Sequence, residues 1–347
     1  MAKAPPVFQV VRGFRESAGT KIEISNMPRI RSQDSFGVCF GFSAAVIAQK
    51  KACDTDRKNF PLDKVGKPYN CSDIPLEKQI SPFSMVAWAK PTEKSTQIGD
   101  FMNHRNITLA GGEVKAGTGA HALNNSYTDF SFLPESCYPF DQVANKYGDN
   151  KELVAKLVED LNKLYKDNRK TEANTSALCE SCLAEEINER LGTHIKAKNI
   201  SKALEEATFA EFLHKAVFYG CPRIHLEPKP QPKVGYFPEN SAEGTREKLL
   251  PKIKEVLNSG NPIQVDGVCV LRDEPTDECT GRHSFVISGY KKVCSAQNQC
   301  RDLVKVHNSW DEKWQKEHND GWVDGQSIIE NIDDKPAVGI GILSWLK

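Results

Sequence analysis

The chain has 347 residues, carries 46 Lys and Arg against 46 Asp and Glu, and has a mean hydropathy of −0.50. This length predicts two or three domains with a sizeable core. The balanced charge excludes a global attraction to nucleic acid or to a membrane surface, and no stretch is long and apolar enough to span a membrane. The opening run MAKAPPVFQVV lacks the apolar core of a signal peptide, so we expect any signal segment to lie outside this chain.

The first predicted element is a buried helix that begins near Cys39. Residues 33–43 read QDSFGVCFGFS, and no residue in 35–48 is charged, which suits a helix inside a core. At the start of such a helix, unpaired N–H groups and the helix dipole favour a thiolate on Cys39, the attacking species in nucleophilic catalysis. The side-chain amide of Gln33 could donate to an oxyanion beside that sulfur. The alternative is a structural cysteine buried in the core.

Two helical patterns in the middle of the chain predict an inserted segment at about 149–222. The first has an apolar face made of Leu153, Val154, Leu157, Val158, Leu161, Leu164 and Tyr165. The second runs over 202–219. The segment either packs on the scaffold without a role in chemistry, or it walls the substrate cleft or docks a partner.

The last third of the chain predicts strands at 263–270, 283–293 and 303–307. In the second strand, alternation places His283, Phe285 and Ile287 on one face and Val286 on the other. The residues between the second and third strands, SAQNQ, predict a hairpin loop.

The predicted hairpin brings two polar side chains close to each other. If Cys294 faces Cys300, then His283 lies opposite residue 311, three positions from Asn308. One bulge would bring the imidazole and the amide together. Taken singly, His283 can be a hydrogen-bonded strand histidine and Asn308 a turn residue. Together with Cys39, they follow one another along the chain in the order nucleophile, base and orienter.

These residues, in this order, resemble the papain family of cysteine peptidases (clan CA). The resemblance implies Gln33 as oxyanion donor, Cys39 as nucleophile, His283 as base and Asn308 as orienter. In the Asn308-Ser309-Trp310 run it implies that Trp310 shields the hydrogen bond between base and orienter. Further matches are Gly111 and Gly112, a glycine pair that binds the substrate main chain, Tyr138-Pro139-Phe140 and Asn261-Pro262-Ile263.

The resemblance implies an α+β, papain-like fold of two domains with an inserted helical subdomain. Residues 1–148 form the mostly helical left-hand domain, 149–222 the insertion, and 223–347 the right-hand, β-barrel-like domain. Several departures indicate a divergent member. Phe36 replaces the first cysteine of a family disulfide, Phe40-Gly41 replaces Trp-Ala, and a longer, charged segment follows Trp310.

By the same resemblance, Glu113, Asp266 and Ser284 line the subsite for the side chain two residues before the scissile bond. Two carboxylates and a hydroxyl predict a preference for Lys or Arg, because an unpaired buried charge is costly. The alternative is that the carboxylates point to solvent or pair with Lys115 and Arg282.

The chain has eleven cysteines, and setting Cys39 aside leaves an even number. This suits five disulfides in an oxidising compartment, whether secreted, periplasmic or lysosome-like. Pairs that would close local loops are Cys53–Cys71, Cys269–Cys279 and Cys294–Cys300, while the connectivity of Cys137, Cys179, Cys182 and Cys221 stays open. The Cys179–Cys182 spacing also suits a redox pair or half of a zinc site, but no matching ligand pair stands at zinc-finger spacing. We expect no metal and no cofactor.

These features predict a cysteine endopeptidase that hydrolyses peptide bonds through a thioester on Cys39. Two alternatives stay open: an amidase or acyltransferase of the same fold that acts on crosslinked or cell-wall peptides, and a binding protein with a retired active site. The expected partners are a peptide or protein substrate, and a proteinaceous inhibitor or propeptide in the cleft.

Overall fold

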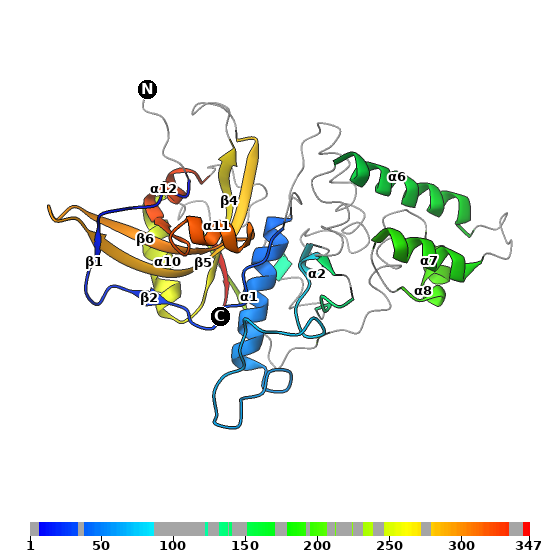
Figure 1. The fold of residues 1–347 in the computed structure, drawn as a ribbon, viewed down its shortest axis with the longest axis horizontal. Helices are drawn as coiled ribbons and strands as arrows, with labels where there is room; N and C mark the ends of the chain where they lie inside the picture. Colours follow the sequence, from blue (N-terminus) through cyan, green and yellow to red (C-terminus); the bar gives the residue numbers. More distant parts are fainter. Residues whose placement is uncertain are drawn as a thin grey trace.

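The computed structural model describes residues 7–33, 38–86, 122–123, 132–137, 139–140, 151–170, 179–191, 195–206, 212, 224, 232–238, 246–271, 279–332 and 343–347. Within these ranges the chain is a mixed α/β structure with an antiparallel sheet, so the predicted α+β class is confirmed at this level. Helix α1 (Cys39–Thr55) runs between the sheet on one side and helices α6 (Lys151–Asn168), α7 (Glu180–Leu191) and α8 (Ala197–Ala203) on the other (Figure 1).

Helix α1 begins at Cys39, as the sequence predicts, and it is buried on nearly all sides. Of its 17 residues 13 are buried, which matches its lack of a polar face. The helix ends where Asp56 turns the chain. The carboxylate of Asp56 accepts hydrogen bonds from the backbone N–H groups of Lys58 and Asn59, and so offers the backbone an alternative to another helical turn.

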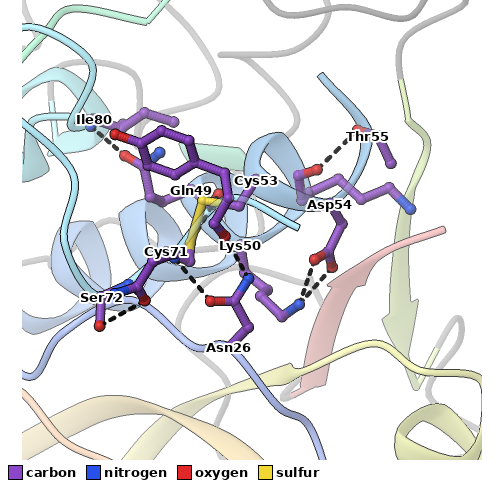
Figure 2. Close-up of a disulfide and its surroundings, with 12 residues drawn as sticks. Asn26, Gln49, Lys50, Cys53, Asp54, Thr55, Cys71, Ser72 and Ile80 are labelled. Atoms are coloured by element: carbon purple, nitrogen blue, oxygen red, sulfur yellow. Dashed lines mark hydrogen bonds and ion pairs between the residues drawn. A yellow bond between two sulfur atoms is a disulfide. The ribbon is translucent and has the colours of Figure 1, made fainter. Parts of the chain in front are cut away.

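The C-terminal half of α1 is tied to the loop that follows it by the buried disulfide Cys53–Cys71 (Figure 2). The side-chain oxygen of Asn26 accepts from the backbone N–H of Cys71 at 2.8 Å. On the helix itself, Oε1 of Gln49 accepts from the N–H of Ile80 at 2.6 Å. A disulfide that closes a loop of this length contributes roughly 3 kcal/mol. The helix that carries Cys39 is therefore anchored at its far end.

The sheet has the strand order β3-β8-β4-β5-β6-β7, and β1 and β2 pair with β5. The strands are β1 (Arg15–Glu16), β2 (Ile22–Glu23), β3 (Val234–Phe237), β4 (Ile263–Leu271), β5 (Gly281–Cys294), β6 (Cys300–His307), β7 (Trp322–Asp324) and β8 (Leu343–Leu346). The other elements are α2 (Pro82–Val86), the 3-10 helix η1 (Arg246–Lys248), α10 (Leu249–Asn258), α11 (Asp311–Glu317) and α12 (Gly325–Glu330). The three strands predicted from the sequence are confirmed as β4, β5 and β6.

The register of β5 against β6 contains one shift. Cys294 pairs with Cys300, as the sequence predicts, and this register continues to the pair of Gly289 and Lys305. Between Gly289 and Ile287 it slips by one residue, so Ile287 pairs with Val306. The shift moves the end of β6 one position closer to the start of β5.

Strand β5 separates two hydrophobic clusters. Phe285 and Ile287 pack with residues of β4 and α10, while Val286 joins the cluster that contains α1. The predicted alternation is thus confirmed. Helix α1 packs against β5, and Cys39 at the start of the helix contacts Ser284 near the start of the strand.

The segment 149–222, predicted to be a helical insertion, contains helices and a turn among its described residues. Helix α6 is confirmed, and Leu161, Leu164 and Tyr165 of its predicted apolar face are buried. The helix predicted over 202–219 is wrong at its start, because α8 ends at Ala203 and a turn follows. The carbonyl of Leu204 there accepts from the N–H of Lys170 instead of continuing the helix. The rest of that run, apart from residue 212, lies outside the described residues.

The disulfide predictions agree with the structure. Cys269–Cys279 and Cys294–Cys300 are bonded, like Cys53–Cys71, and Cys179 is bonded to Cys182. Cys137 is also disulfide-bonded, while Cys221 lies outside the described residues. Within the described ranges, no helix has the length and apolar character needed to cross a membrane.

Candidate active site

A hydrogen bond joins His283 to Asn308 in the interior of the protein. Nε2 of His283, on β5, lies 2.7 Å from Oδ1 of Asn308, the residue that follows β6. The backbone N–H of Ser309 donates to the same Oδ1 at 2.8 Å, which supports its assignment as the amide oxygen. Because an amide oxygen only accepts, Nε2 carries the proton and Nδ1 is left to act as a base. The strand register brings the two side chains together; their catalytic roles stay predictions.

The indole of Trp310 covers one face of this imidazole. The two ring centroids are 4.3 Å apart and the ring planes differ by 20°, a stacked arrangement. His283 is 3% exposed and Asn308 1% exposed. The hydrogen bond between them is therefore shielded from water, and a hydrogen bond is electrostatically stronger in such surroundings.

Cys39 is the first residue of α1 and a buried free thiol. Its sulfur accepts hydrogen bonds from the backbone of Ser284, the residue after His283, and from the backbone of Phe40. The sulfur therefore lies beside the start of β5. Its hydrogen bonds go to Ser284 and Phe40, and none joins it to the imidazole.

Burial sets the protonation states of both groups. Loss of water raises the pKa of Cys39 to about 11, and the hydrogen bond from the backbone N–H of Ser284 opposes this only in part. Burial likewise lowers the pKa of His283 to about 4, although the hydrogen bond to Asn308 favours the charged ring. Burial thus opposes the thiolate expected at the helix start: a helix dipole contributes at most about 2 kcal/mol, whereas full burial shifts a pKa by up to about 3–5 units, or roughly 4–7 kcal/mol. At neutral pH the pair is a thiol and a neutral imidazole.

Gln33 is held by Ser309, the residue after Asn308. The Ser309 hydroxyl donates to Oε1 of Gln33, and the backbone N–H of Gln33 donates to the Ser309 carbonyl at 2.8 Å. With its oxygen engaged, the amide of Gln33 directs its NH₂ group away from Ser309. The segment before α1 is thereby joined to the segment after β6, which carries Asn308.

Two of the three predicted subsite residues contact each other. The Ser284 hydroxyl donates to Oδ1 of Asp266 at 2.6 Å, and Nε2 of Gln264 donates to the same oxygen at 3.0 Å. Asp266 is 9% exposed, so its carboxylate does not point to solvent. The third residue, Glu113, and the glycine pair Gly111 and Gly112 lie outside the described residues.

A small cavity lies between α1 and the ends of β5 and β6, with Arg31, Phe42, His307 and Asn308 among its walls. Nε2 of His307 and Nδ2 of Asn308 are buried and have no hydrogen-bond partner among the described residues. The free space is about 10 Å³, enough for a single water. The cavity fits a solvent molecule and is too small for a substrate side chain.

Three residues of this region had no role predicted from the sequence: Ser309, Trp314 and Phe8. Trp314 lies in the charged segment that forms α11, four residues after Trp310. Side chains four residues apart on a helix lie on the same face, so this spacing could have indicated that the two indoles are neighbours. No pattern in the sequence connects Phe8 with the other rings. Its neighbours became visible only in the folded chain.

Where the structure describes the chain, no three His, Cys, Asp or Glu residues are placed to hold a metal ion. No protein-family model and no curated protein matches this chain. Among solved structures, the bromelain protease from Ananas comosus in complex with the E64 inhibitor matches at 12% identity and a TM-score of 0.39, over 95% of this chain and 99% of that one. ProCathepsin B from Trypanosoma congolense matches at 10% identity and a TM-score of 0.39, over 99% of this chain and 82% of that one. Both neighbours are papain-like cysteine proteases, and at these scores the function has to be argued from the site itself.

Proposed function

We propose that this protein is a papain-like cysteine peptidase in which Cys39 attacks the peptide carbonyl. The observation that carries the proposal is the buried pair of His283 and Asn308 under the stacked Trp310, beside the thiol at the start of α1. In this proposal residues 1–148 and 223–347 are the two domains that flank the cleft, and 149–222 is an insertion between them.

The reaction requires a proton transfer before the attack. Nδ1 of His283 takes the proton of the Cys39 thiol, and the resulting thiolate adds to the carbonyl carbon. Asn308 accepts from Nε2 throughout and fixes the ring. The Nε2 group of Gln33 and the backbone N–H of Cys39 donate to the oxyanion. His283 then protonates the leaving amine and activates the water that hydrolyses the thioester.

The neutral state of the buried pair describes a resting enzyme. The pKa values of about 11 for Cys39 and about 4 for His283 oppose charge separation while both groups are dry. Two opposite charges in contact at an effective dielectric of about 20 regain only about 4 kcal/mol. We therefore propose that substrate binding brings the sulfur and Nδ1 together and lets polar groups of the substrate stabilise the charged pair.

For substrate choice we propose that Asp266 sits in the subsite for the side chain two residues before the scissile bond. It is a buried carboxylate that accepts hydrogen bonds from Ser284 and Gln264, and it acts on the pKa of Cys39 through its charge. A cationic Lys or Arg side chain is the complementary group. The partners are accordingly peptides or proteins, with an inhibitor or a propeptide as a competing occupant of the cleft.

The disulfides of the described chain suit an oxidising compartment, and we propose a secreted, periplasmic or lysosome-like location. Thiol counting after purification without reductant tests this: one reactive thiol supports it, and three or more contradict it.

Labelling with a peptidyl epoxide tests the function itself. We expect a single adduct, on Cys39, together with hydrolysis of dipeptide substrates. Labelling with turnover only on crosslinked or cell-wall peptides would instead identify an amidase or acyltransferase of this fold. Absence of labelling at every pH between 4 and 9 would identify a retired site that binds without catalysis.

A further inference from the structure

Phe8 is the centre of an aromatic cluster that reaches the candidate active site. Its ring centroid lies 5.0 Å from Trp314 and 5.5 Å from Trp310, with ring planes at 83° and 88°. It also lies 5.3 Å from Phe285 and 6.5 Å from His283. These are edge-to-face contacts, the geometry that aromatic rings prefer when they stabilise each other.

The backbone on both sides of Phe8 is hydrogen-bonded to α12 and to β7. The Ser327 hydroxyl, on α12, lies 2.8 Å from the carbonyl of Val7 and 2.8 Å from that of Asp324, and its proton is shared between the two. The N–H of Asp324, the last residue of β7, donates to the carbonyl of Gln9 at 2.9 Å. These contacts hold the main chain on both sides of Phe8 against the sheet side of the fold. The contact with the tryptophans is thus built by the main chain as well as by packing.

Trp310 is the link between Phe8 and the imidazole. One face of its indole lies on His283, and Trp314 meets it at 5.9 Å with ring planes at 83°. Trp310 and Trp314 are both half-buried, so neither is locked by a surrounding core. Phe8 packs against both indoles at once. If Phe8 were removed, the two rings would lose their shared contact, and Trp310 would gain freedom to tilt away from His283.

We propose that Phe8 is a positioning residue that presses Trp310 onto His283 and so keeps the imidazole dry and bonded to Asn308. The kinetic consequence of this role rests on the proposed function, but the structural consequence does not. Misplacing a reacting group by about 1 Å can cost roughly 100-fold in rate. A loosened Trp310 should act in this way, on turnover more than on substrate binding, because Phe8 itself touches neither the sulfur nor the subsite of Asp266.

The chain offers a matched control in Phe14. It belongs to the same N-terminal arm and is also half-buried, but it packs against Val293, Leu303 and Trp322, a separate cluster. Phe14→Ala therefore removes a phenyl ring from the arm without touching the contact to Trp310.

The experiment compares Phe8→Ala, Phe8→Tyr and Phe14→Ala with the parent chain by two readouts. The first is the pKa of the His283 imidazole from an NMR titration, assigned with His283→Ala. The ionisable groups on the elements around it include Cys39, Asp266, Arg282, His307 and His318, and none of them differs between the variants. We expect Phe8→Ala to raise the pKa of His283 by one unit or more toward its ordinary value, because the ring gains water. Phe8→Tyr and Phe14→Ala should leave it within 0.3 units.

The second readout is the kinetics of peptide hydrolysis. We expect kcat to fall by about 10- to 100-fold in Phe8→Ala with KM within threefold, and Phe8→Tyr to restore most of it. Equal effects of Phe8→Ala and Phe14→Ala on both readouts, or an unchanged pKa in Phe8→Ala, would overturn the proposal. If Phe8→Ala does not fold, Phe8→Leu replaces it, and the same outcomes decide. A chain that hydrolyses no peptide disproves the proposed function, while the titration still decides the role of Phe8.

Discussion

His283 and Asn308 are 25 residues apart in the sequence, yet Nε2 of one lies 2.7 Å from Oδ1 of the other. The hairpin of β5 and β6 creates this contact, and its register shift between Gly289 and Ile287 contributes one position of the approach. Without the shift, the end of β6 would lie one residue farther from the start of β5.

Replacing the proposed nucleophile should abolish both covalent labelling and turnover. In Cys39→Ala we expect no adduct with a peptidyl epoxide and no hydrolysis above background, because the other cysteines of the described chain are in disulfides. Intact-mass spectrometry followed by peptide mapping measures the adduct. A labelled Cys39→Ala chain, or adducts at several cysteines of the parent chain, would show that another thiol is the reactive one.

The base should matter more than its orienter. His283→Ala should lower kcat by roughly 10²–10⁴, the usual contribution of general acid–base catalysis, because it removes the proton acceptor. Asn308→Ala should cost less, because it removes only the partner that holds Nε2. Steady-state kinetics on one dipeptide substrate ranks the two variants. The reverse order would contradict the assigned roles.

Gln33 and Ser309 should act as one unit. Gln33→Ala should lower kcat by about 10²–10³, as expected for the loss of one oxyanion donor. Ser309→Ala should lower it by less, because the amide stays but loses the donor that holds its oxygen. In the double variant, Ser309→Ala should add almost nothing. Additive losses in this double-mutant cycle would mean that Ser309 does not act through Gln33.

His307 should make the fold sensitive to acid. Burial, and to a smaller extent the charge of Lys305, lower its pKa to about 4. At a pH between about 6.5, the ordinary pKa of histidine, and about 4, His307 binds a proton in the unfolded chain but not in the folded chain. The free energy of unfolding therefore falls as the pH falls. At pH 5 the loss from His307 should be about 2 kcal/mol. Urea unfolding at pH 7.5 and pH 5 should show a smaller loss in His307→Gln than in the parent chain, and parallel losses would contradict the pKa.

The charge of Asp266 should decide the preferred side chain two residues before the scissile bond. With a dipeptide series carrying Arg, Lys, Leu or Phe at that position, we expect Arg and Lys to be cleaved best. Asp266→Asn keeps the size of the side chain and removes its charge. It should lower kcat/KM for the Arg substrate by at least about tenfold and change the Leu substrate by less than threefold. A preference for Leu and Phe that survives Asp266→Asn would exclude the acidic subsite.

Local patterns in the sequence were enough to predict α1, its start at Cys39, the strands β4, β5 and β6, and the disulfides Cys269–Cys279 and Cys294–Cys300. These features depend on the spacing of apolar residues and on short loops, which neighbouring residues encode. The turn after Ala203, inside the helix predicted over 202–219, was missed; the Leu204 carbonyl there accepts from the N–H of Lys170, a partner far away in the sequence.

The tertiary structure alone decided the electrostatics and the support of the candidate site. The helix start argued for a thiolate on Cys39, but burial by distant segments raises its pKa to about 11, and loss of water outweighs a dipole that acts within one turn. Phe8 shows the same limit. Its ring meets Trp310 where the flanking carbonyls accept from the Ser327 hydroxyl of α12 and the Asp324 N–H of β7, and such a contact between chain ends leaves no local pattern in the sequence.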